Sequence, residues 1–569
     1  MKKNPTIYHV QQFVSIQDML LNSAAQFGEK LALEDLKDTP IPKVTYNGLL
    51  RNVLKFGAAL QSLGLKERSH IAVVGENRVQ WGITYLTAMC FNHIIVPVDK
   101  NLTVNEIINI VHESEAVAVV FSESFDSLFR EARHSLKRLH HYISMDQLTE
   151  KDGVHSMAEL MNRSRGCTVD DLPGVQPRDL AVIIFTSGTL GRAKGVMLSQ
   201  KNLASNLISM RSLFEIVPQD RFLSVLPMHH TYECTCGFLC PVSAGASVHY
   251  ARSLKTIVDD LQLVKATMLL AVPLLYDKMF KRIYKSIQEN KIVSKLVGPL
   301  QKISSVVEQF GWKSFRKTLF KEIHHRFGGH IRCFIAGGAA PDPAVAKGLR
   351  DFGFSFIQGY GLTETSPILT LNQLDNFKDD SAGFPLPGIQ LKINRPDADG
   401  VGEVWAMGPN VMLGFYKNEK ATSEVFEDGW FKTGDEGYID GDGMLHISGR
   451  KKNVIISKSG KNVFPEEVED VLHRSPYVLE SLVYGETDPK QDEIIAAQIV
   501  VDAEAFIELS DSKGVPITDS LINDVIAQEV RAANNSLAAY KQIKKFYIRD
   551  QEFEKTTTQK IKRYLVVRQ

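Results

Sequence analysis

The pattern of hydrophobic and polar positions alternates between helical and strand signals over roughly the first 380 residues. Leu49, Leu50, Val53, Leu54 and Ala58 recur at the spacing of one helix face. Short apolar runs, rich in β-branched residues and bounded by polar residues or glycine, predict strands between such segments. These runs are Ile71–Val74, Ile94–Val96, Ala116–Phe121, Leu180–Phe185, Phe222–Leu226, Ser247–Tyr250, Ile331–Ile335 and Phe354–Ile357. Strands separated by helices predict an α/β fold with largely parallel sheets.

The pattern of hydrophobic and polar positions changes near Gly383. From there on, short strand signals separated by turn residues replace the alternation of helices and strands. The turns are Asp397-Ala398-Asp399-Gly400 and Asp440-Gly441-Asp442-Gly443. Aspartate and glycine in such turns are typical of β-hairpins. The sequence therefore predicts a smaller β subdomain after the α/β part.

Residues 278–332 form a basic stretch with apolar residues at helical spacing. They hold thirteen Lys or Arg and three Glu, and Ile303, Val306, Val307 and Phe310 are interleaved among them. One interpretation is a solvated helical insertion that covers the core. The other is a patch for an anionic membrane surface or for the phosphates of a ligand.

Composition narrows the class of protein. A chain of 569 residues with 44% hydrophobic residues exceeds one core, so we expect two or more domains. The 66 basic and 66 acidic residues balance, which argues against a nucleic-acid-binding protein as a whole. We expect no signal peptide, because Met1–Pro5 leads into a polar segment, and no membrane-spanning helix, because the apolar run Ala266–Tyr276 is short and contains proline.

Six cysteines without a framework spacing fit a reducing cytoplasm. Cys234, Cys236 and Cys240 lie close together, but neither a CxxC pair nor clustered histidines accompany them. We expect them to be buried packing residues rather than zinc ligands.

A loop after the run Leu180–Phe185 combines the residue types that bind phosphate. Glycines allow backbone N–H groups to approach an anion, hydroxyls donate to phosphate oxygens, and a lysine adds positive charge. The spacing differs from a Walker A loop. The candidate ligands are Thr186, Ser187, Gly188, Thr189, Gly191 and Lys194.

This loop resembles the first signature of the adenylate-forming superfamily, which includes acyl-CoA synthetases, adenylation domains of peptide synthetases and luciferases. The family pattern is close to Thr-Ser-Gly-Thr-Thr-Gly-x-Pro-Lys-Gly. This chain departs from it at Leu190, where Thr is usual, and at Ala193, where Pro is usual.

The segment Gln358–Pro367 resembles the second signature of the family. The aromatic face of Tyr360 suits adenine, Thr363 can donate to the α-phosphate, and Glu364 is a hard oxygen ligand for Mg²⁺. Gly337–Pro341 resembles the segment that lines the other side of the adenine, with Gly338 and Ala339 at its centre.

Three more segments resemble family motifs. Lys432–Asp435 resembles the ribose-binding turn, in which the Asp435 carboxylate accepts hydrogen bonds from vicinal hydroxyls. Arg450 would add a second ribose contact, and the resemblance makes Lys452 the hinge residue. In Leu226–Tyr232, His230 occupies the position that faces the acyl carboxylate, where it orients the carboxylate or gates the acyl tunnel; a buried packing histidine is the alternative.

The C-terminal region carries two further similarities. Ser459–Glu469 resembles a segment that meets the active site during the thiol step, and Lys555–Arg563 resembles the terminal signature, whose lysine is essential for adenylation. Lys560 matches that lysine by its spacing to Ile561 and Arg563. Gln559 replaces the usual glycine, and Lys555 and Lys562 are rival lysines.

The motifs stand in family order from about residue 180 to 563 and imply the fold and the activity. We expect a large N-terminal domain over residues 1–449, made of parallel-sheet α/β subdomains and a small β subdomain, a hinge at 450–453, and a small mobile α+β domain at 454–569. The implied reaction activates a carboxylic acid with ATP and Mg²⁺ to an acyl-adenylate and transfers the acyl group to coenzyme A. Lys560, His230, Thr363 and Glu364 would be the catalytic residues.

The chain is most similar to bacterial long-chain fatty acid–CoA ligases, so a medium- or long-chain fatty acid is the expected substrate. An aryl acid, a carrier protein as acceptor, and a non-catalytic nucleotide-binding relative remain alternatives. We expect a cytoplasmic protein with no nucleic-acid partner, and peripheral membrane contact through residues 278–332 is an alternative to a solvated insertion.

Overall fold

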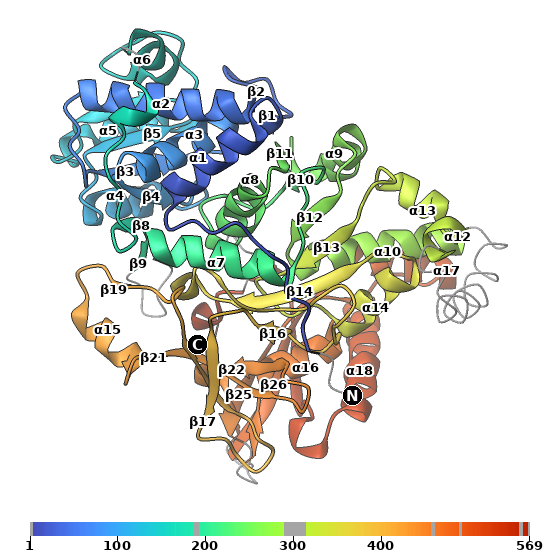
Figure 1. Ribbon diagram of the computed structural model, residues 1–569. Coiled ribbons are helices and arrows are strands. Elements are labelled where there is room, and N and C mark those ends of the chain that lie inside the picture. Colours follow the sequence, from blue (N-terminus) through green and yellow to red (C-terminus); the bar gives the residue numbers. More distant parts are fainter. Residues whose placement is uncertain are drawn as a thin grey trace. The chain divides into compact units, whose positions relative to one another are not determined.

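The computed structural model describes residues 4–164, 167–186, 193–289, 315–456, 461–488, 492–556 and 561–566. The chain forms two compact units, and Figure 1 traces it from the N-terminus in blue to the C-terminus in red. The first comprises Met1–Leu391, Ala406–Phe431 and Asp442–Met444. The second comprises Lys392–Trp405, Lys432–Gly441 and Leu445–Gln569.

A nine-stranded sheet in the first unit carries most of the predicted motifs. Its order is β16-β15-β14-β13-β12-β10-β11-β1-β2. Pairing is parallel from β14 to β1 and antiparallel at both edges. The strands are β1 (Leu31–Asp35), β2 (Lys43–Thr45), β10 (Arg221–Ser224), β11 (Ser247–Tyr250), β12 (Met268–Ala271), β13 (Cys333–Ala336), β14 (Phe356–Gly361), β15 (Ile368–Leu371) and β16 (Phe384–Pro385).

An eight-stranded sheet in the same unit has the order β19-β9-β8-β4-β3-β5-β6-β7. It is parallel from β8 to β7, and β9 is antiparallel to both of its neighbours. The strands are β3 (His70–Val74), β4 (Ile94–Val98), β5 (Ala118–Phe121), β6 (His141–Ser144), β7 (His155–Ser156), β8 (Leu180–Thr186), β9 (Lys194–Ser199) and β19 (Gly414–Phe415). Two largely parallel sheets connected by helices confirm the predicted α/β class.

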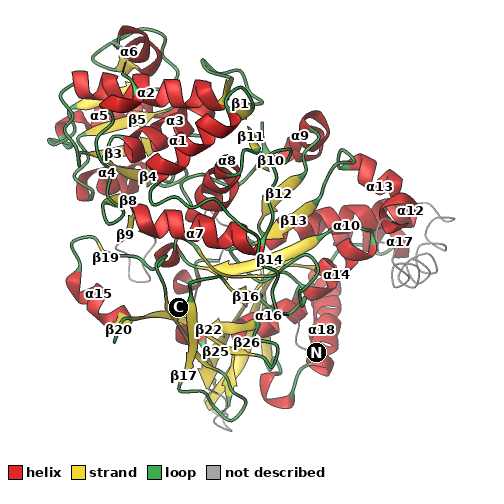
Figure 2. Cartoon of the chain, in the orientation of Figure 1, coloured by secondary structure: helices red, strands yellow, loops and turns green. Residues whose placement is uncertain are grey.

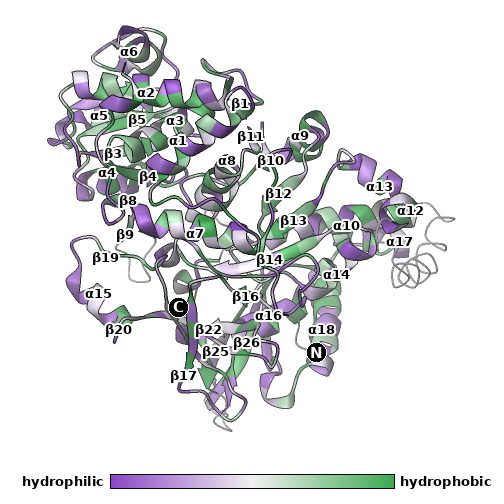
Figure 3. Ribbon diagram, in the orientation of Figure 1, coloured by the Kyte–Doolittle hydropathy of each residue, from purple (hydrophilic) through white to green (hydrophobic). Residues whose placement is uncertain are grey.

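Helices connect and cover these strands (Figure 2). Helix α2 carries both hydrophobic and hydrophilic residues (Figure 3), and its buried residues include the predicted Leu49, Val53 and Leu54. The helices are α1 (Ile16–Phe27), α2 (Tyr46–Ser62), α3 (Val79–Cys90), α4 (Val104–Glu113), α5 (Asp126–Glu131), α6 (Met157–Arg163), α7 (Gln200–Leu213), α8 (Cys240–Ser243), α9 (Ile257–Val264), α10 (Pro273–Glu289), α12 (Phe315–Leu319), α13 (Lys321–Arg326), α14 (Pro343–Asp351) and α15 (Glu419–Val425), with a π-helix at Tyr232–Leu239.

The apolar run Ala266–Tyr276 divides into β12 and the first turn of α10, which begins at Pro273. Within the residues that the structure describes, no helix has the length and apolar character needed to cross a bilayer. The described ends of the basic stretch are helical, in α10, α12 and α13, whereas residues 290–314 lie outside the described residues.

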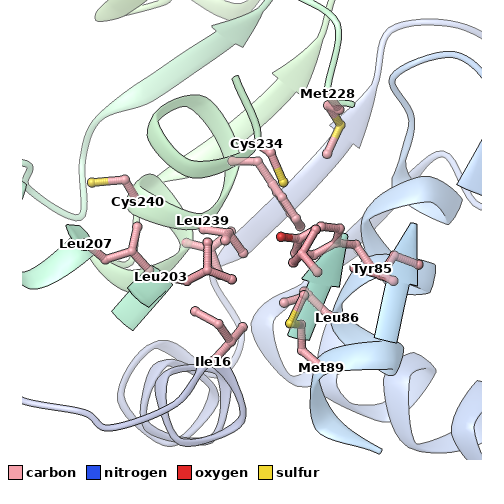
Figure 4. Packing of buried hydrophobic residues seen from close by; sticks show 14 of the residues in the cluster. Ile16, Tyr85, Leu86, Met89, Leu203, Leu207, Met228, Cys234, Leu239 and Cys240 are labelled. Carbon is pink, nitrogen blue, oxygen red and sulfur yellow. The ribbon is translucent and has the colours of Figure 1, made fainter. Parts of the chain in front are cut away.

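The predicted packing role of the cysteines is confirmed for Cys234 and Cys240. Both are buried, and they lie among apolar side chains such as Leu203, Leu207 and Leu239 (Figure 4). Cys236 is partly buried against the same core. These thiols fill space in the centre of the first unit.

The second unit combines strands with a small C-terminal α+β region. The strand β18 lies between β17 and β21, and β22 pairs antiparallel with β21 across the predicted Asp440–Gly443 turn. The elements of this part are β17 (Gln390–Asn394), β18 (Gly402–Met407), β20 (Phe426–Glu427), β21 (Trp430–Ile439), β22 (Leu445–Arg450), β23 (Ile455–Ile456), β24 (Asn462–Val463), α16 (Pro465–Leu472), β25 (Val478–Asp488), β26 (Asp492–Val501), α17 (Ala503–Lys513), α18 (Asp519–Ser536) and β27 (Lys545–Arg549), of which β20 and parts of β17, β18 and β21 belong to the first unit. Strands β25, β26 and β27 form a separate sheet whose apolar face packs with α16, α17 and α18.

Candidate active site

The predicted phosphate loop connects two antiparallel strands. Thr186 at the end of β8 pairs with Lys194 at the start of β9, and its hydroxyl donates to the Lys194 carbonyl oxygen at 3.4 Å. The Lys194 ammonium lies 5.0 Å from the centroid of the Phe415 ring. Both side chains therefore stand at the base of the loop. The other candidates, Ser187, Gly188, Thr189 and Gly191, and the departure Leu190, lie outside the described residues.

The remaining motifs of the first unit follow neighbouring parallel strands. Strands β10, β12, β13 and β14 run side by side in one direction. The His230 loop follows β10, Gly338 and Ala339 follow β13, and Thr363 follows β14. Because the carboxyl ends of parallel strands meet at one edge of a sheet, these segments converge there.

The turn after β13 requires its glycines. A Cβ atom at Gly337 would approach Cζ of Tyr232 within 2.6 Å, and Gly338 has φ +84°. The Tyr232 hydroxyl donates to the carbonyl oxygen of Ile335 at 3.1 Å. Tyr232 therefore joins the segment after β10 to the turn that holds Gly338 and Ala339. Helix α14 follows this turn with Asp342 as its N-cap.

The second signature forms a tight turn at the end of β14. A Cβ atom at Gly361 would lie 1.8 Å from the Pro367 carbonyl oxygen, which accepts a hydrogen bond from the Leu362 N–H at 3.0 Å. Tyr360, Thr363 and Glu364 are partly buried beside this turn. The backbone carbonyl of Glu364 accepts from the Met412 N–H at 2.8 Å, so its main chain is fixed.

Asn410, which no sequence motif indicates, also holds this turn. It is 1% exposed, and its amide donates to the carbonyl oxygens of Thr365 at 2.7 Å and Ile368 at 3.2 Å. The Ser366 hydroxyl donates to the Asn410 carbonyl oxygen at 2.8 Å. These bonds connect segments more than 40 residues apart, so no local sequence signal could have revealed them.

The loop that carries His230 is held by Asn77, which follows β3. The Asn77 amide donates to the Leu226 carbonyl oxygen at 2.6 Å and accepts from the Met228 N–H at 3.0 Å. His230 is partly buried, and its ring centroid lies 4.1 Å from that of His229. His230 therefore has a fixed backbone and a histidine neighbour, and it is not a fully buried core residue.

The π-helix after His230 contains a second unpredicted residue, Glu233. It is 1% exposed, and neither carboxylate oxygen has a hydrogen-bond partner of normal geometry. Burial raises its pKa to about 8, against a smaller opposing effect of the Ser224 hydroxyl. A Cβ atom at Gly237 would lie 2.7 Å from the Glu233 carboxyl carbon, so glycine makes room for the side chain. The carboxyl group is protonated at neutral pH.

The predicted ribose-binding residues meet across β21 and β22 of the second unit. Asp435 is opposite Arg450 in the antiparallel register, and Nε of Arg450 lies 2.8 Å from Oδ1 of Asp435. The Asp435 N–H donates to the Thr433 hydroxyl at 3.1 Å, and that hydroxyl donates to the Val404 carbonyl oxygen at 2.7 Å. The Asp435 carboxylate is therefore held by an ion pair and suited to accept hydrogen bonds from a diol.

Lys452 follows β22 in a short 3₁₀ turn, Lys451–Asn453. Asn453 donates to a Glu466 carboxylate oxygen at 2.7 Å, which connects this turn to the start of α16. Lys560 and Gln559 lie outside the described residues. The rival Lys555 forms ion pairs with Glu480 and, at 2.8 Å, with Glu552, and the rival Lys562 lies 3.8 Å from Glu554.

Two family comparisons cover most of the chain. The family described as AMP-binding enzyme matches residues 20–416. The family described as AMP-binding enzyme C-terminal domain matches residues 467–560. These ranges include the motifs of the first unit, the end of the Ser459–Glu469 segment and Lys560, whereas Asp435, Arg450 and Lys452 lie between them.

Similar proteins agree with these matches. The chain is 29% identical to the long-chain-fatty-acid–CoA ligase FadD15 of Mycobacterium bovis, over 89% of this chain and 87% of that protein. It is 28% identical to the chloroplastic long-chain-fatty-acid–[acyl-carrier-protein] ligase AEE15 of Arabidopsis thaliana, over 84% of this chain and 75% of that protein.

Two solved structures share the fold. The anthranilate CoA ligase AuaEII in complex with anthranoyl-AMP has a TM-score of 0.77 at 20% identity, covering 99% of this chain and 97% of the other. The o-succinylbenzoate CoA synthetase MenE of Bacillus subtilis with ATP and magnesium has a TM-score of 0.72 at 23% identity, covering 96% and 98%. The chain therefore belongs to the AMP-binding enzyme family and is an AMP-forming acid–thiol ligase of the adenylate-forming superfamily.

Proposed function

We propose that this enzyme activates a medium- or long-chain fatty acid with ATP and transfers the acyl group to coenzyme A. The observation that carries the proposal is the convergence of Gly338, Thr363, Glu364 and His230 at the carboxyl edge of β10, β13 and β14, in the unit that also holds Lys194. The long-chain fatty acid ligases among the relatives support the fatty substrate.

In the first step a carboxylate oxygen of the acid attacks the α-phosphorus of ATP, and the bond to pyrophosphate breaks. This transfer requires positioning and charge neutralisation more than covalent catalysis. Lys194, Thr363 and Lys560 would stabilise the phosphates, and His230 would orient the acyl carboxylate. Tyr360 and Ala339 would hold the adenine, and Asp435 with Arg450 the ribose.

Glu364 offers the ligand that Mg²⁺ prefers, a carboxylate oxygen on a backbone fixed by the Met412 N–H. A bound ion would neutralise phosphate charge. One carboxylate together with substrate phosphates is a usual Mg²⁺ environment in nucleotide enzymes.

In the second step the coenzyme A thiol attacks the acyl carbon, and AMP leaves. The resemblance assigns a rotation of residues 454–569 about Lys452 to the change between the two steps. The proposal therefore includes a domain boundary before residue 454 and a hinge at Lys452.

Acid-dependent AMP release tests the proposal. The assay uses saturated fatty acids of graded length, with benzoate and cinnamate as aryl arms, each with and without coenzyme A. We expect AMP and acyl-CoA to rise together over one range of chain length. Preference for an aryl acid would replace the fatty substrate, and ATP binding without AMP from any acid would favour a non-catalytic relative.

A carrier protein is a second acceptor, which the Arabidopsis relative favours, because its name gives acyl-carrier protein as acceptor. The same assay with a phosphopantetheinylated carrier protein in place of coenzyme A separates the two. Thioester formed on the carrier alone would assign it as the acceptor.

For the location of the enzyme, we propose the cytoplasm, with peripheral membrane contact through residues 278–332. In the described part of this stretch, Met279, Ile283 and Ile287 of α10 are buried in the core, which fits the interpretation of a covering insertion. Sedimentation with anionic and with neutral vesicles tests it, and binding only to anionic vesicles would support an electrostatic contact.

A further inference from the structure

Asp99, His229 and His230 bring three potential metal-ligand atoms together in the first unit. One nitrogen or oxygen of each residue lies within 4.8 Å of the other two. Asp99 follows β4 of the eight-stranded sheet, whereas the histidines follow β10 of the nine-stranded sheet. The cluster therefore depends on the packing of two sheets.

The buried histidine of this cluster lacks a hydrogen bond. His229 is 7% exposed, and its Nε2 atom is buried without a hydrogen-bond partner. It lies 3.4 Å from Oδ2 of Asp99, an ion-pair distance that is long for a hydrogen bond. The other oxygen, Oδ1, accepts from the Asn101 N–H at 2.9 Å, which fixes the carboxylate.

Two other buried histidines lie closer to their carboxylate partners than His229 does. His249 lies 2.8 Å from Glu34, and His446 lies 3.0 Å from Asp440, both at hydrogen-bonding distance. In those two pairs the histidine and the carboxylate form a direct hydrogen bond. The His229–Asp99 contact is longer, and the imidazole of His230 lies beside it.

The spacing matches the edge of a tetrahedral metal site. With zinc–nitrogen and zinc–oxygen bonds of about 2.0–2.2 Å, ligand atoms stand about 3.4 Å apart. The Asp99–His229 distance is 3.4 Å. The His230 nitrogen lies within 4.8 Å of the other two ligand atoms, so a side-chain movement of at most about 1.4 Å completes the set. Asn77 holds the backbone of the histidine loop, so two of the three ligands start from a fixed main chain.

We propose that Asp99, His229 and His230 bind a divalent transition-metal ion, with Zn²⁺ as the expected ion. Two imidazoles and one carboxylate suit zinc better than Mg²⁺, which prefers oxygen ligands. Three protein ligands leave one position for water or an anionic ligand. The site is distinct from the Mg²⁺ position proposed at Glu364.

Metal binding by the full-length, tag-free enzyme tests the proposal without nucleotide present. The protein is stripped with a chelator and titrated with Zn²⁺ in competition with a chromophoric chelator, and in parallel with Co²⁺, whose visible absorption reports tetrahedral coordination. We expect one equivalent to bind. Asp99→Asn and His229→Gln should each weaken binding at least about tenfold, since ligand loss exceeds the effect of changing an outer hydrogen bond.

His155→Gln is the matched control, because His155 forms a surface pair with Glu150 at 3.1 Å outside this cluster. This variant should bind Zn²⁺ like the wild type. Thermal unfolding of the metal-free variants shows whether each is folded, and Zn²⁺ should raise the melting temperature of the wild type and of the control alone.

Absence of Zn²⁺ binding by the wild type at micromolar concentration would overturn the proposal. Equal binding by the wild type, Asp99→Asn and His229→Gln would do the same. If one variant is unfolded without metal, the other decides, because Asp99 and His229 belong to different segments.

Discussion

At the scale of single residues, the protonated Glu233 gives a pH-dependent prediction. Its folded pKa of about 8 exceeds the usual glutamate value, because burial disfavours the charge. Between pH 4.5 and 8 the unfolded chain releases this proton while the folded chain retains it. The free energy of unfolding contributed by this residue therefore falls as pH rises through that window.

Glu233→Gln should remove this dependence, because glutamine keeps the shape of the neutral acid. We expect the melting temperature of the variant relative to the wild type to be several degrees higher at pH 8 than at pH 5, from a difference on the order of a few kcal/mol. Glu131→Gln, at an exposed position, is the control and should show no such change. An equal difference at both pH values would refute the protonated state.

Some of these residues could be predicted from the sequence and others could not. His230, Asp435 and Arg450 were predicted from motifs, and the structure shows the last two paired at 2.8 Å. Asn410, Glu233 and Asp99 were not predicted. The roles of Asn410 and Asp99 come from contacts between segments far apart in the chain, and that of Glu233 comes from burial. An isolated Asn, Glu or Asp has no periodic pattern that would indicate such a contact or such burial.

At the scale of elements, the turn after β14 depends on the absence of a side chain at Gly361. Gly361→Ala would place a Cβ atom 1.8 Å from the Pro367 carbonyl oxygen, so the turn that carries Thr363 and Glu364 has to shift. We expect AMP formation to fall at least about a hundredfold, because displacement of positioning groups by 1 Å has this effect.

The control for this change is Gly174→Ala, since a Cβ atom at exposed Gly174 would meet nothing within 4 Å. AMP formation by this variant should equal that of the wild type. Circular dichroism and thermal unfolding separate a local shift from global unfolding. Full activity of Gly361→Ala would show that the turn is not rigid.

Strands were predicted well where the sequence contains one continuous apolar run. Strands β3, β4, β8 and β11 coincide closely with apolar runs, since strands of parallel sheets are buried on both faces. The π-helix at Tyr232–Leu239 was not predicted, because its apolar spacing resembles that of an α-helix. Strands β13 and β14 begin two residues later than the runs predicted, because such boundaries depend on pairing with neighbouring strands.

At the scale of the whole molecule, Lys452 tests whether the C-terminal region moves between the two steps. Lys452→Pro fixes φ at this position and should slow thioester formation from supplied acyl-adenylate at least about tenfold, with a smaller effect on adenylate formation. Lys452→Ala is the matched control, because it removes the charge and keeps the backbone freedom. Equal loss in both steps, or in both variants, would reject the hinge.

Because the two steps require different residues, assays of each step can identify the essential lysine among Lys555, Lys560 and Lys562. Lys560→Ala should reduce adenylate formation at least about a hundredfold and leave thioester formation from supplied acyl-adenylate nearly unchanged, since only the first step develops charge on the departing pyrophosphate. Lys555 is ion-paired with Glu480 and Glu552, so Lys555→Ala should lower the melting temperature of the protein. The ratio between the rates of adenylate and thioester formation should stay the same. Lys562, 3.8 Å from Glu554, should tolerate alanine in both assays. If Lys555→Ala or Lys562→Ala instead abolishes adenylation alone, the essential lysine is that residue, and the spacing that favours Lys560 is misleading because Gln559 replaces the usual glycine.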